Sequence, residues 1–381
     1  MSAARGATTA DVVIVGAGAM GSAAAYALAA RGVRVVALDR WAPPHAHGST
    51  HGRTRIIREA YFEHPSYVPL VRDAYARWAA IAEASGQELF RQTGGLMVGP
   101  PDGELVTGAE ASARAHGVAF ERLSAREVRA RFPGLEPGEE MVAVLEPRAG
   151  ILFPERCVDA MLALARRHGA AIHVGERVTA WRAAGGVVTV TTDRARYEAP
   201  RLVLAPGAWF GALAPDLPLP LAVERQVMLW LAPRAHAERF RAERSPVALW
   251  EYAPGRIFYH IPDVGHGVKV ALHHGGEIVD PDAPRDPPRP AELEAIRALA
   301  ARVLPDANGR AVDAATCLYT NAPDGHFVID AHPAHPEVLV VSACSGHGFK
   351  FASAIGAAVA ELVVDGAASH DLSRFRFSGR G

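Results

Sequence analysis

Apolar residues at the start of the chain fall into two short runs, separated by an alanine-rich stretch with helical spacing. The runs at residues 11–15 and 33–38 predict buried strands, and the second closes at Asp39. Residues 22–30 predict a helix that ends at Gly32, because glycine readily terminates a helix. The order strand, helix, strand predicts a β-α-β unit and therefore a parallel sheet.

The same two periodicities recur along the rest of the chain. Helical spacing predicts helices at residues 67–84, 108–116, 124–131, 154–167, 291–303 and 351–364. Apolar or alternating runs predict strands at residues 171–174, 187–191, 201–205, 327–330 and 338–342, with further β-type alternation through 220–280. Residues 40–60 show no period and predict a long functional loop, and residues 280–290 predict a proline-rich connector.

Composition excludes several classes of protein. The 381 residues are 49% hydrophobic and 21% charged, which excludes a disordered chain and allows two domains. A net charge of -1 gives no global field, so we expect neither nucleic acid nor an anionic membrane as a partner. The first ten residues lack the apolar stretch of a signal peptide, and no apolar run approaches the roughly 18 residues of a membrane span.

Cysteine and lysine are the two rare residue types that carry information. The three cysteines, Cys157, Cys317 and Cys344, form neither a disulfide framework nor a CxxC metal motif, so we expect a reducing compartment, by default the cytoplasm. Only two of the 40 basic residues are lysines, Lys269 and Lys350. The bias is typical of coding composition, but the two exceptions indicate positions where a compact ammonium cannot be exchanged for a planar guanidinium.

A glycine motif, Gly16-Ala-Gly18-Ala-Met-Gly21, lies directly between the first strand and the first helix. Gly16 permits the tight turn, Gly18 lets a pyrophosphate approach the backbone, and Gly21 permits close packing of helix on strand. Asp39, at the end of the second strand, can accept hydrogen bonds from ribose hydroxyls. This context predicts a dinucleotide site, although the motif does not separate FAD from NAD and also occurs as a glycine-rich turn in unrelated α/β proteins.

Imidazoles and guanidiniums concentrate in residues 43–58, just after the dinucleotide unit. The His45-Ala-His47 spacing is compatible with a metal site, but no Asp, Glu or Cys cluster accompanies it, so we expect no metal. A solvated basic loop is a second interpretation. The third is a wall of positive charge that faces a bound cofactor and an anionic substrate.

Several segments together resemble one known family, the monomeric sarcosine oxidase and N-methyltryptophan oxidase family of FAD-dependent amine oxidases. The resemblance extends over essentially the whole chain, and its most specific parts are Cys317-Leu-Tyr319-Thr and Ser345-Gly-His-Gly-Phe-Lys-Phe. The other residues that carry it are His51, Arg55 and Arg58. The resemblance implies FAD as the cofactor, which the glycine motif alone leaves open.

The resemblance implies that Cys317 is bonded covalently to the 8α-methyl carbon of the flavin through a thioether. This chemistry requires a thiolate beside an electron-poor flavin, and a nearby cation favours the thiolate. An isolated cysteine is more often a small buried hydrophobe, which is the competing interpretation.

The resemblance also implies roles for the other site residues. Arg58 and Lys350 are expected to bind the substrate carboxylate, the first as a bidentate fork and the second as a point charge. The expected flavin neighbours are His51 and Arg55 on one face and Lys269 on the other. The expected pocket for the amine consists of Tyr259, His273 and Tyr319, for which core packing is the alternative. The expected cofactor-binding residues are Gly16, Gly18, Gly21, Asp39, Arg40, Cys317, Gly346 and Gly348.

One segment departs from the family. Around His51 the family pattern is His-His-Gly-Asp, whereas this chain has Thr50-His51-Gly52-Arg53. The change from Asp to Arg reverses a charge close to the expected flavin loop, so we expect altered electrostatics there.

These observations predict an α/β fold in which two domains interleave. The Rossmann-like FAD-binding domain comprises residues 1–85, 150–215 and 318–381. The α+β substrate domain, built on a mixed β-sheet, comprises residues 86–149 and 216–317. We expect the active site at their interface, as is usual for cofactor sites on sheets.

The expected activity is the oxidation of a secondary amino acid, such as sarcosine or another N-methyl amino acid, by O₂. Its products would be the demethylated amino acid, formaldehyde and H₂O₂, formed by a cytoplasmic monomer. The alternatives are an amine dehydrogenase or cyclic imino-acid oxidase of the same fold, and a flavin-binding protein without turnover.

Overall fold

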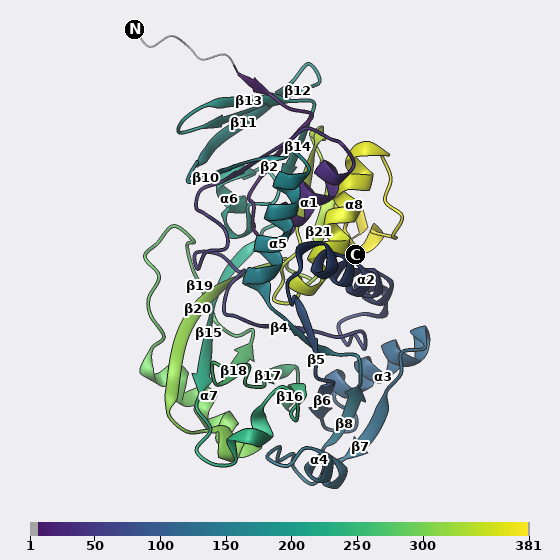
Figure 1. Cartoon of the computed structure of the whole chain (residues 1–381), viewed down its shortest axis with the longest axis vertical. Helices are drawn as coiled ribbons and strands as arrows, with labels where there is room; N and C mark the ends of the chain where they lie inside the picture. The colour runs from purple at the N-terminus through teal and green to yellow at the C-terminus, as the bar shows by residue number, and fades with distance from the viewer. Residues whose placement is uncertain (1–6, 380–381) are drawn as a thin grey trace.

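A six-stranded sheet forms the upper half of the molecule in the computed structural model, which describes residues 7–379 (Figure 1). Its strand order is β10-β3-β2-β14-β22-β21, and all neighbours are parallel except β21 and β22. The strands are β2 (Val12–Val15), β3 (Val35–Asp39), β10 (Ala171–Val174), β14 (Arg201–Leu204), β21 (Val328–His332) and β22 (His335–Ser342). Every residue of β2 and β3 is buried, and apart from Asp39 at the end of β3 both strands are continuous apolar runs in the sequence.

Helices cover one face of this sheet, and a smaller sheet covers the other. The helices are α1 (Ala19–Ala30), α2 (Val68–Ser85), α5 (Pro154–Arg167) and α8 (Ala352–Val364), and α1 packs against both α5 and α8. The smaller sheet has the order β1-β13-β12-β11, with β1 (Thr8–Thr9), β13 (Arg196–Ala199), β12 (Val187–Thr192) and β11 (Val178–Ala184). Alternation along β2 places Ile14 in the core under the helices and Val13 in the core under the smaller sheet.

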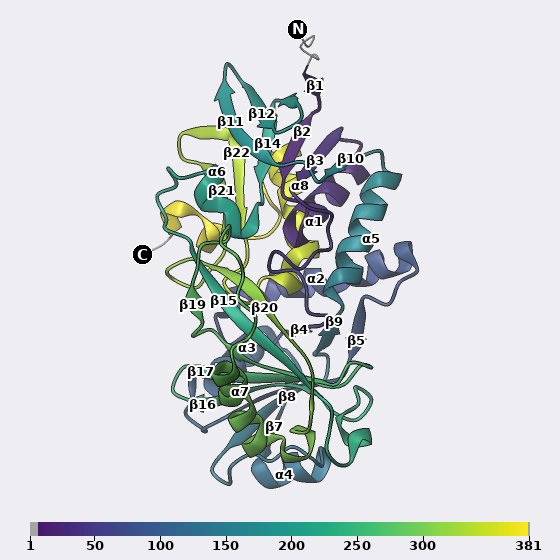
Figure 2. The same cartoon turned by 90° about the vertical axis from the view of Figure 1, so that its left-hand side faces the viewer.

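A nine-stranded mixed sheet forms the lower half of the molecule (Figures 1 and 2). Its order is β19-β15-β18-β17-β16-β6-β8-β7, with β20 also paired to β15, and only the β16–β6 pair is parallel. Its strands are β6 (Gly95–Gly99), β7 (Glu121–Ser124), β8 (Val142–Glu146), β15 (Ala222–Leu231), β16 (Val247–Ala253), β17 (Arg256–Ile261), β18 (Val268–His273), β19 (Glu277–Ile278) and β20 (Ala311–Asn321).

Two helices bury the outer face of the nine-stranded sheet, α4 (Ala125–Arg131) and α7 (Pro290–Val303). α3 (Glu104–His116) packs on β6 and β8, and α6 (Phe210–Leu213) follows β14. The long strands β15 and β20 run together from the lower half toward the upper half (Figures 1 and 2). A three-stranded sheet, β4 (Arg55–Ile57), β9 (Gly150–Leu152) and β5 (Phe90–Gln92), lies between the halves. The inner face of the large sheet is therefore free to line a cavity.

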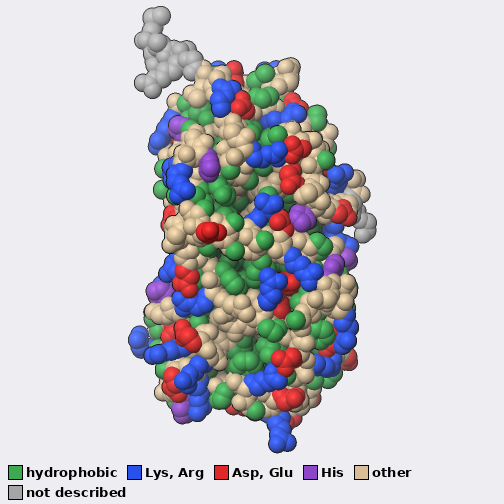
Figure 3. Space-filling view, turned by 45° about the vertical axis from the view of Figure 1, so that its right-hand side comes forward, with side chains coloured by type: hydrophobic (Ala, Val, Ile, Leu, Met, Phe, Trp, Pro, Cys, Tyr) green, Lys and Arg blue, Asp and Glu red, His purple; other side chains and the backbone are tan. Residues whose placement is uncertain are grey.

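The predicted fold class, a Rossmann-like α/β unit combined with a mixed sheet, is confirmed. The domain boundaries stay a prediction, and residues 1–6 and 380–381 of the predicted segments lie outside the described residues. Within residues 7–379, no helix is long and apolar enough to cross a membrane. Figure 3 shows acidic and basic side chains interspersed over the face that it presents.

Several local predictions are confirmed and others are wrong. The structure confirms α5 at residues 154–167, and α4 begins with a capping box formed by Ser124 and Glu127. The predicted start of α1 at Ser22 is three residues late, because the glycine motif itself forms the first turn of that helix. The predicted start of α3 at Gly108 is four residues late, since the helix begins after Gly103. We did not predict β11, whose residues are mostly exposed or half-buried and form no apolar run.

Candidate active site

One cavity lies between the six-stranded sheet and the inner face of the nine-stranded sheet. The glycine motif, the 40–58 segment, β17, β18, β20 and the turn before α8 all contribute to its lining. The predicted site residues that line it are Gly16, Gly18, Asp39, Arg40, Arg55, Arg58, Tyr259, His273, Cys317, Tyr319, Gly346, Gly348 and Lys350. Three predicted residues, Gly21, His51 and Lys269, are not part of the lining.

The glycine motif has the geometry of a dinucleotide cradle. Gly16 adopts φ +90°, and a Cβ on it would lie 2.3 Å from the carbonyl oxygen of Ala205. A Cβ on Gly21 would lie 1.7 Å from the carbonyl oxygen of Gly16, so Gly21 acts through packing. Asp39 accepts a hydrogen bond from the Ala17 backbone at 2.8 Å, which places its carboxylate beside the motif. Since α1 begins at this turn, its free N–H groups can hold phosphates, and the residues present fit a dinucleotide cofactor.

The nine-stranded sheet brings the other site residues together by alternation. Met228 is the register partner of Ala271, and Ala271 is also the partner of Tyr259, so all three side chains share one face. By the same parity, that face also carries Lys269, His273, Cys317 and Tyr319. Met228, Tyr259, His273, Cys317 and Tyr319 line the cavity from this face, whereas Ala271 and Lys269 do not.

Cys317 is 2% exposed and packs with Met228, Trp230 and Tyr319, beside Cys344. Burial raises the pKa of its thiol, whereas the positive charges of Arg55 and Lys269 act in the opposite direction. All three cysteines of the chain are free thiols. The thiol thus lies in the cavity wall, where two cations partly offset the effect of burial on its pKa.

Lys269 is buried beneath the 50–55 segment. It is 2% exposed, and its Nζ donates hydrogen bonds to the carbonyl oxygens of Gly52 at 3.0 Å and Thr54 at 3.1 Å. Burial lowers its pKa well below the usual range, while the two carbonyls favour the charged form. His51, 8% exposed, has an unpartnered Nε2, and burial lowers its pKa to about 3.

The two cations predicted to bind a carboxylate meet at Tyr61. The guanidinium carbon of Arg58 lies 4.4 Å from the centroid of the Tyr61 ring, and Lys350 Nζ lies 5.2 Å from the same centroid. Tyr61 Oη is 2.6 Å from His347 Nδ1, and His347 Nε2 is 3.0 Å from the carbonyl oxygen of Gly325, so we assign the proton to Nε2. Burial, followed by the charge of Arg58, lowers the pKa of Lys350 to about 7.

The carboxylate of Glu63 forms an ion pair with the Arg58 guanidinium. Arg58 Nη2 donates to both carboxylate oxygens of Glu63 at 2.7 Å. A substrate carboxylate that takes the same donors must therefore compete with Glu63. We missed both Tyr61 and Glu63 in the sequence. They lie three and five residues after Arg58, just where the unpatterned segment ends, and that position is the only signal that could have indicated them.

An aromatic group lies beside these cations. The rings of His273 and Tyr319 are 5.8 Å apart. A Cβ on Gly346 would approach Tyr319 and His273 to 2.8 and 2.9 Å, so Gly346 leaves the space that the two rings occupy. Enclosure by protein, followed by neighbouring positive charge, lowers the pKa of His273 well below its usual range. His273 is therefore neutral at pH 7 and does not repel a cationic amine.

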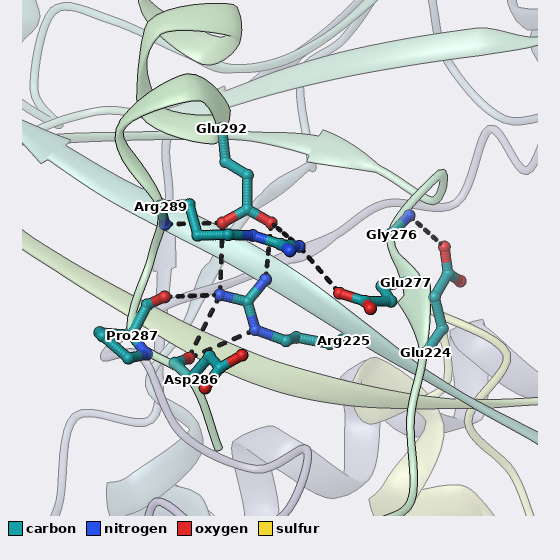
Figure 4. A network of polar contacts seen from close by, with 8 residues as sticks. All are labelled: Glu224, Arg225, Gly276, Glu277, Asp286, Pro287, Arg289 and Glu292. Carbon is teal, nitrogen blue, oxygen red and sulfur yellow. Dashed lines mark hydrogen bonds and ion pairs between the residues drawn. The ribbon is translucent and has the colours of Figure 1, made fainter. Parts of the chain in front are cut away.

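The segment 280–289, which we call the strap, crosses from the large sheet to the dinucleotide loop. At one end Arg225 donates to the carbonyls of Asp286 and Pro287 and to Glu292, as Figure 4 shows. At the other end Asp282, which lines the cavity, pairs with Arg40. The predicted connector thus closes one wall of the cavity.

Of the two departures from the family, Thr50 lines the cavity and Arg53 does not. Arg53 pairs with Asp313 and lies over the ring of Trp230, with its guanidinium carbon 4.8 Å from the ring centroid. Its charge is therefore compensated locally, and its side chain does not line the cavity. His47 stacks on Trp41 at 4.4 Å, and within residues 7–379 no three His, Cys, Asp or Glu side chains are placed to hold a metal ion.

A nucleotide cradle that opens into a cavity lined by Arg58, Lys350 and Cys317 fits a dinucleotide-dependent oxidoreductase. The sequence profile of the family described as FAD dependent oxidoreductase matches residues 11–362, so the chain belongs to this family. The predicted family and the predicted FAD dependence are confirmed.

Curated relatives span nearly the whole chain. It is 42% identical over 371 residues to the monomeric sarcosine oxidase of Streptomyces avermitilis, which covers 96% of this chain and 97% of that protein. It is 34% identical over 371 residues to the N-methyl-L-tryptophan oxidase of Salmonella arizonae, with 97% and 98% covered.

Solved structures share the fold at lower identity. NikD, an amino acid oxidase, has a TM-score of 0.85 at 24% identity, with 97% of both chains covered. The L-proline dehydrogenase of P. horikoshii has a TM-score of 0.84 at 21% identity, again with 97% of both chains covered. At these identities the likeness concerns the fold alone.

Proposed function

We propose that the chain is an oxidase of secondary amino acids, with sarcosine or another N-methyl amino acid as its substrate. The observation that carries the proposal is the convergence of Arg58 and Lys350 on Tyr61, beside the aromatic residues His273 and Tyr319. Such a site offers one end to a carboxylate and the other to an amine with a small substituent. The names of the relatives point to the same substrate class.

The proposed reaction removes two electrons from the C–N bond of the substrate. The resulting imine takes up water and yields the demethylated amino acid and formaldehyde, and O₂ is reduced to H₂O₂. FAD, when bound, accepts the hydride equivalent and passes the electrons to O₂. The protein supplies placement and charge.

The substrate carboxylate displaces Glu63 from Arg58 and takes hydrogen bonds from both cations. Arg58 contributes a two-pronged donor and Lys350 a compact charge, and both are nearly excluded from water at 2% and 6% exposure. Tyr259, His273 and Tyr319 enclose the amine, and the neutral state of His273 avoids charge repulsion.

Residues of the glycine motif, together with Asp39 and Arg40, would hold the dinucleotide part of FAD. Gly346 and Gly348 would leave room near the ring system, since both line the cavity. We propose that Cys317 bonds covalently to the flavin, supported by its place in the cavity wall and by the cations near it. Because Lys269 Nζ donates to the carbonyl oxygens of Gly52 and Thr54, Lys269 would lie on the same side of the flavin as His51 and Arg55, which the same segment carries.

The test is an O₂-consumption and H₂O₂ assay with sarcosine, N-methyl-L-amino acids and cyclic imino acids. We expect stoichiometric H₂O₂ with an N-methyl amino acid. Turnover only with a dye acceptor would indicate a dehydrogenase, and turnover only with a cyclic imino acid would indicate an imino-acid oxidase. No turnover by flavin-loaded protein with any acceptor would indicate a binding protein. We further expect a monomer by light scattering, and a cytoplasmic location by cell fractionation.

A further inference from the structure

A buried carboxylate lies behind the loop that carries Arg58. Glu146 ends β8 and is 0% exposed. Both of its oxygens accept from the Glu59 backbone N–H, Oε1 at 2.8 Å and Oε2 at 2.9 Å, and Oε2 also accepts from the Ala60 backbone at 2.7 Å. The large sheet is thus tied directly to the two residues that follow Arg58.

Arg58 holds the same peptide from the opposite side. Its Nη1 donates to the carbonyl oxygen of Ala60 at 2.9 Å, while the Ala60 N–H donates to Glu146. The guanidinium and the Glu146 carboxylate are therefore linked through a single residue. If the Ala60 peptide moved, the guanidinium would lose the bond that fixes its direction.

The buried position of Glu146 is energetically unfavourable for a charged carboxylate. Burial raises its pKa to about 7, against the two backbone N–H groups and Arg58, which favour the charged form. A sheet of this size does not need a charged group at this place, since the neighbouring strands are held by backbone pairing. The hydrogen bonds of the Glu146 side chain go to the loop that carries Arg58.

We propose that Glu146 is a positioning residue for the substrate carboxylate: it fixes the backbone of Glu59 and Ala60 so that Arg58 presents its guanidinium to the cavity. The inference rests on the proposed carboxylate-binding role of Arg58. Loss of Glu146 weakens the binding of ligands that carry a carboxylate, and it leaves the binding of uncharged analogues nearly unchanged.

The test uses the flavin-loaded enzyme and two inert ligands, methylthioacetate and its amide, with binding followed by the flavin absorbance. In Glu146→Gln an amide NH₂ replaces Oε1 and faces the N–H of Glu59, while the remaining oxygen can still accept from Ala60, so the hold on Glu59 loosens. We expect methylthioacetate to bind about 10-fold more weakly, whereas the affinity for the amide changes less than about twofold.

Glu251→Gln is the matched control. Glu251 is also a buried carboxylate of the large sheet, 4% exposed, and accepts a backbone hydrogen bond from Leu105 at 3.0 Å. It lies in β16, and its carboxylate accepts hydrogen bonds from the Leu105 and Gly255 backbones, both outside the Arg58 loop. Its variant should bind both ligands within about twofold of wild type.

A double-variant cycle separates the inference from the proposed function. If Glu146 acts through Arg58, Glu146→Gln adds no further loss once Arg58 is methionine. Equal losses in both backgrounds, or equal losses for acid and amide, would overturn the positioning role. Unchanged acid binding in Arg58→Met would instead remove the proposed clamp. If Glu146→Gln does not retain flavin, Glu146→Asp is titrated with methylthioacetate instead. This variant keeps the negative charge but has a shorter side chain. Wild-type affinity for methylthioacetate in Glu146→Asp would overturn the inference.

Discussion

The guanidinium of Arg58 lies over the ring of Tyr61, 4.4 Å from its centroid, and this ring is shared with the ammonium of Lys350 at 5.2 Å. Two cations are therefore held side by side in a part of the cavity wall that is nearly excluded from water. The carboxylate of Glu63 neutralises the charge of Arg58. An anionic ligand that joins them relieves their mutual repulsion. This relationship is the physical basis for assigning the substrate carboxylate to this place.

Replacing Lys350 or Arg58 by Met should weaken carboxylate binding by about 1.5–3 kcal/mol, the scale of a hydrogen bond to a charged group. The Kd of methylthioacetate should then rise roughly 10- to 150-fold. Arg53→Met is the control, because Arg53 is paired with Asp313 and does not line the cavity. Unchanged affinity in both clamp variants would place the carboxylate elsewhere.

The binding of a carboxylate ligand should weaken as the pH rises through neutrality. Burial and the charge of Arg58 lower the pKa of Lys350 to about 7, so the free enzyme carries this charge below that pH and loses it above. Titrations of methylthioacetate between pH 6 and 9 should show rising Kd values in the wild type and a flat profile in Lys350→Met. A flat wild-type profile would show that Lys350 does not titrate in this range.

Flavin should remain with the protein after acid precipitation, because a thioether at Cys317 does not hydrolyse. Cys317→Ser should release the flavin into the supernatant. Cys344→Ser is the matched control, since Cys344 lines the same cavity and its variant should keep the flavin bound. Release from the wild type, or retention in Cys317→Ser, would contradict the covalent assignment.

Lys269→Met should slow the re-oxidation of reduced flavin by O₂ by on the order of 10²- to 10⁴-fold, each tenfold requiring about 1.4 kcal/mol. The first electron transfer to O₂ creates superoxide, and a buried ammonium stabilises that anion. Anaerobic reduction by substrate creates no comparable anion and should change much less. Stopped-flow mixing with oxygenated buffer measures the step, and re-oxidation within about threefold of wild type would remove this role for Lys269.

The sequence predicts those features that depend on residues close together in the chain. The glycine motif, Asp39 and the bounds of α5 follow from spacing alone, because turn geometry and helical periodicity are local properties. Most of the predicted site residues meet in one cavity. The resemblance to a family was needed for Cys317 and Lys350, which no periodicity distinguishes from core residues.

Other features depend on contacts between distant segments. Glu146 acts on Glu59, 87 positions earlier, and no pattern near either residue indicates that contact. Lys269 is not part of the cavity lining, and its hydrogen bonds to the carbonyl oxygens of Gly52 and Thr54, more than 200 positions earlier, follow from no local pattern. Side-chain partners across sheets are set by tertiary packing, so the structure is needed to find them.

The central claim is that this protein oxidises a secondary amino acid and passes the electrons to O₂. The most direct measurement mixes the flavin-loaded enzyme with sarcosine or an N-methyl-L-amino acid without O₂, and then admits air. The account predicts that substrate bleaches the flavin absorbance, and that air restores it with one H₂O₂ and one formaldehyde for each substrate consumed. A flavin that stays oxidised with every secondary amino acid, or that is reduced but not re-oxidised by air, would contradict it.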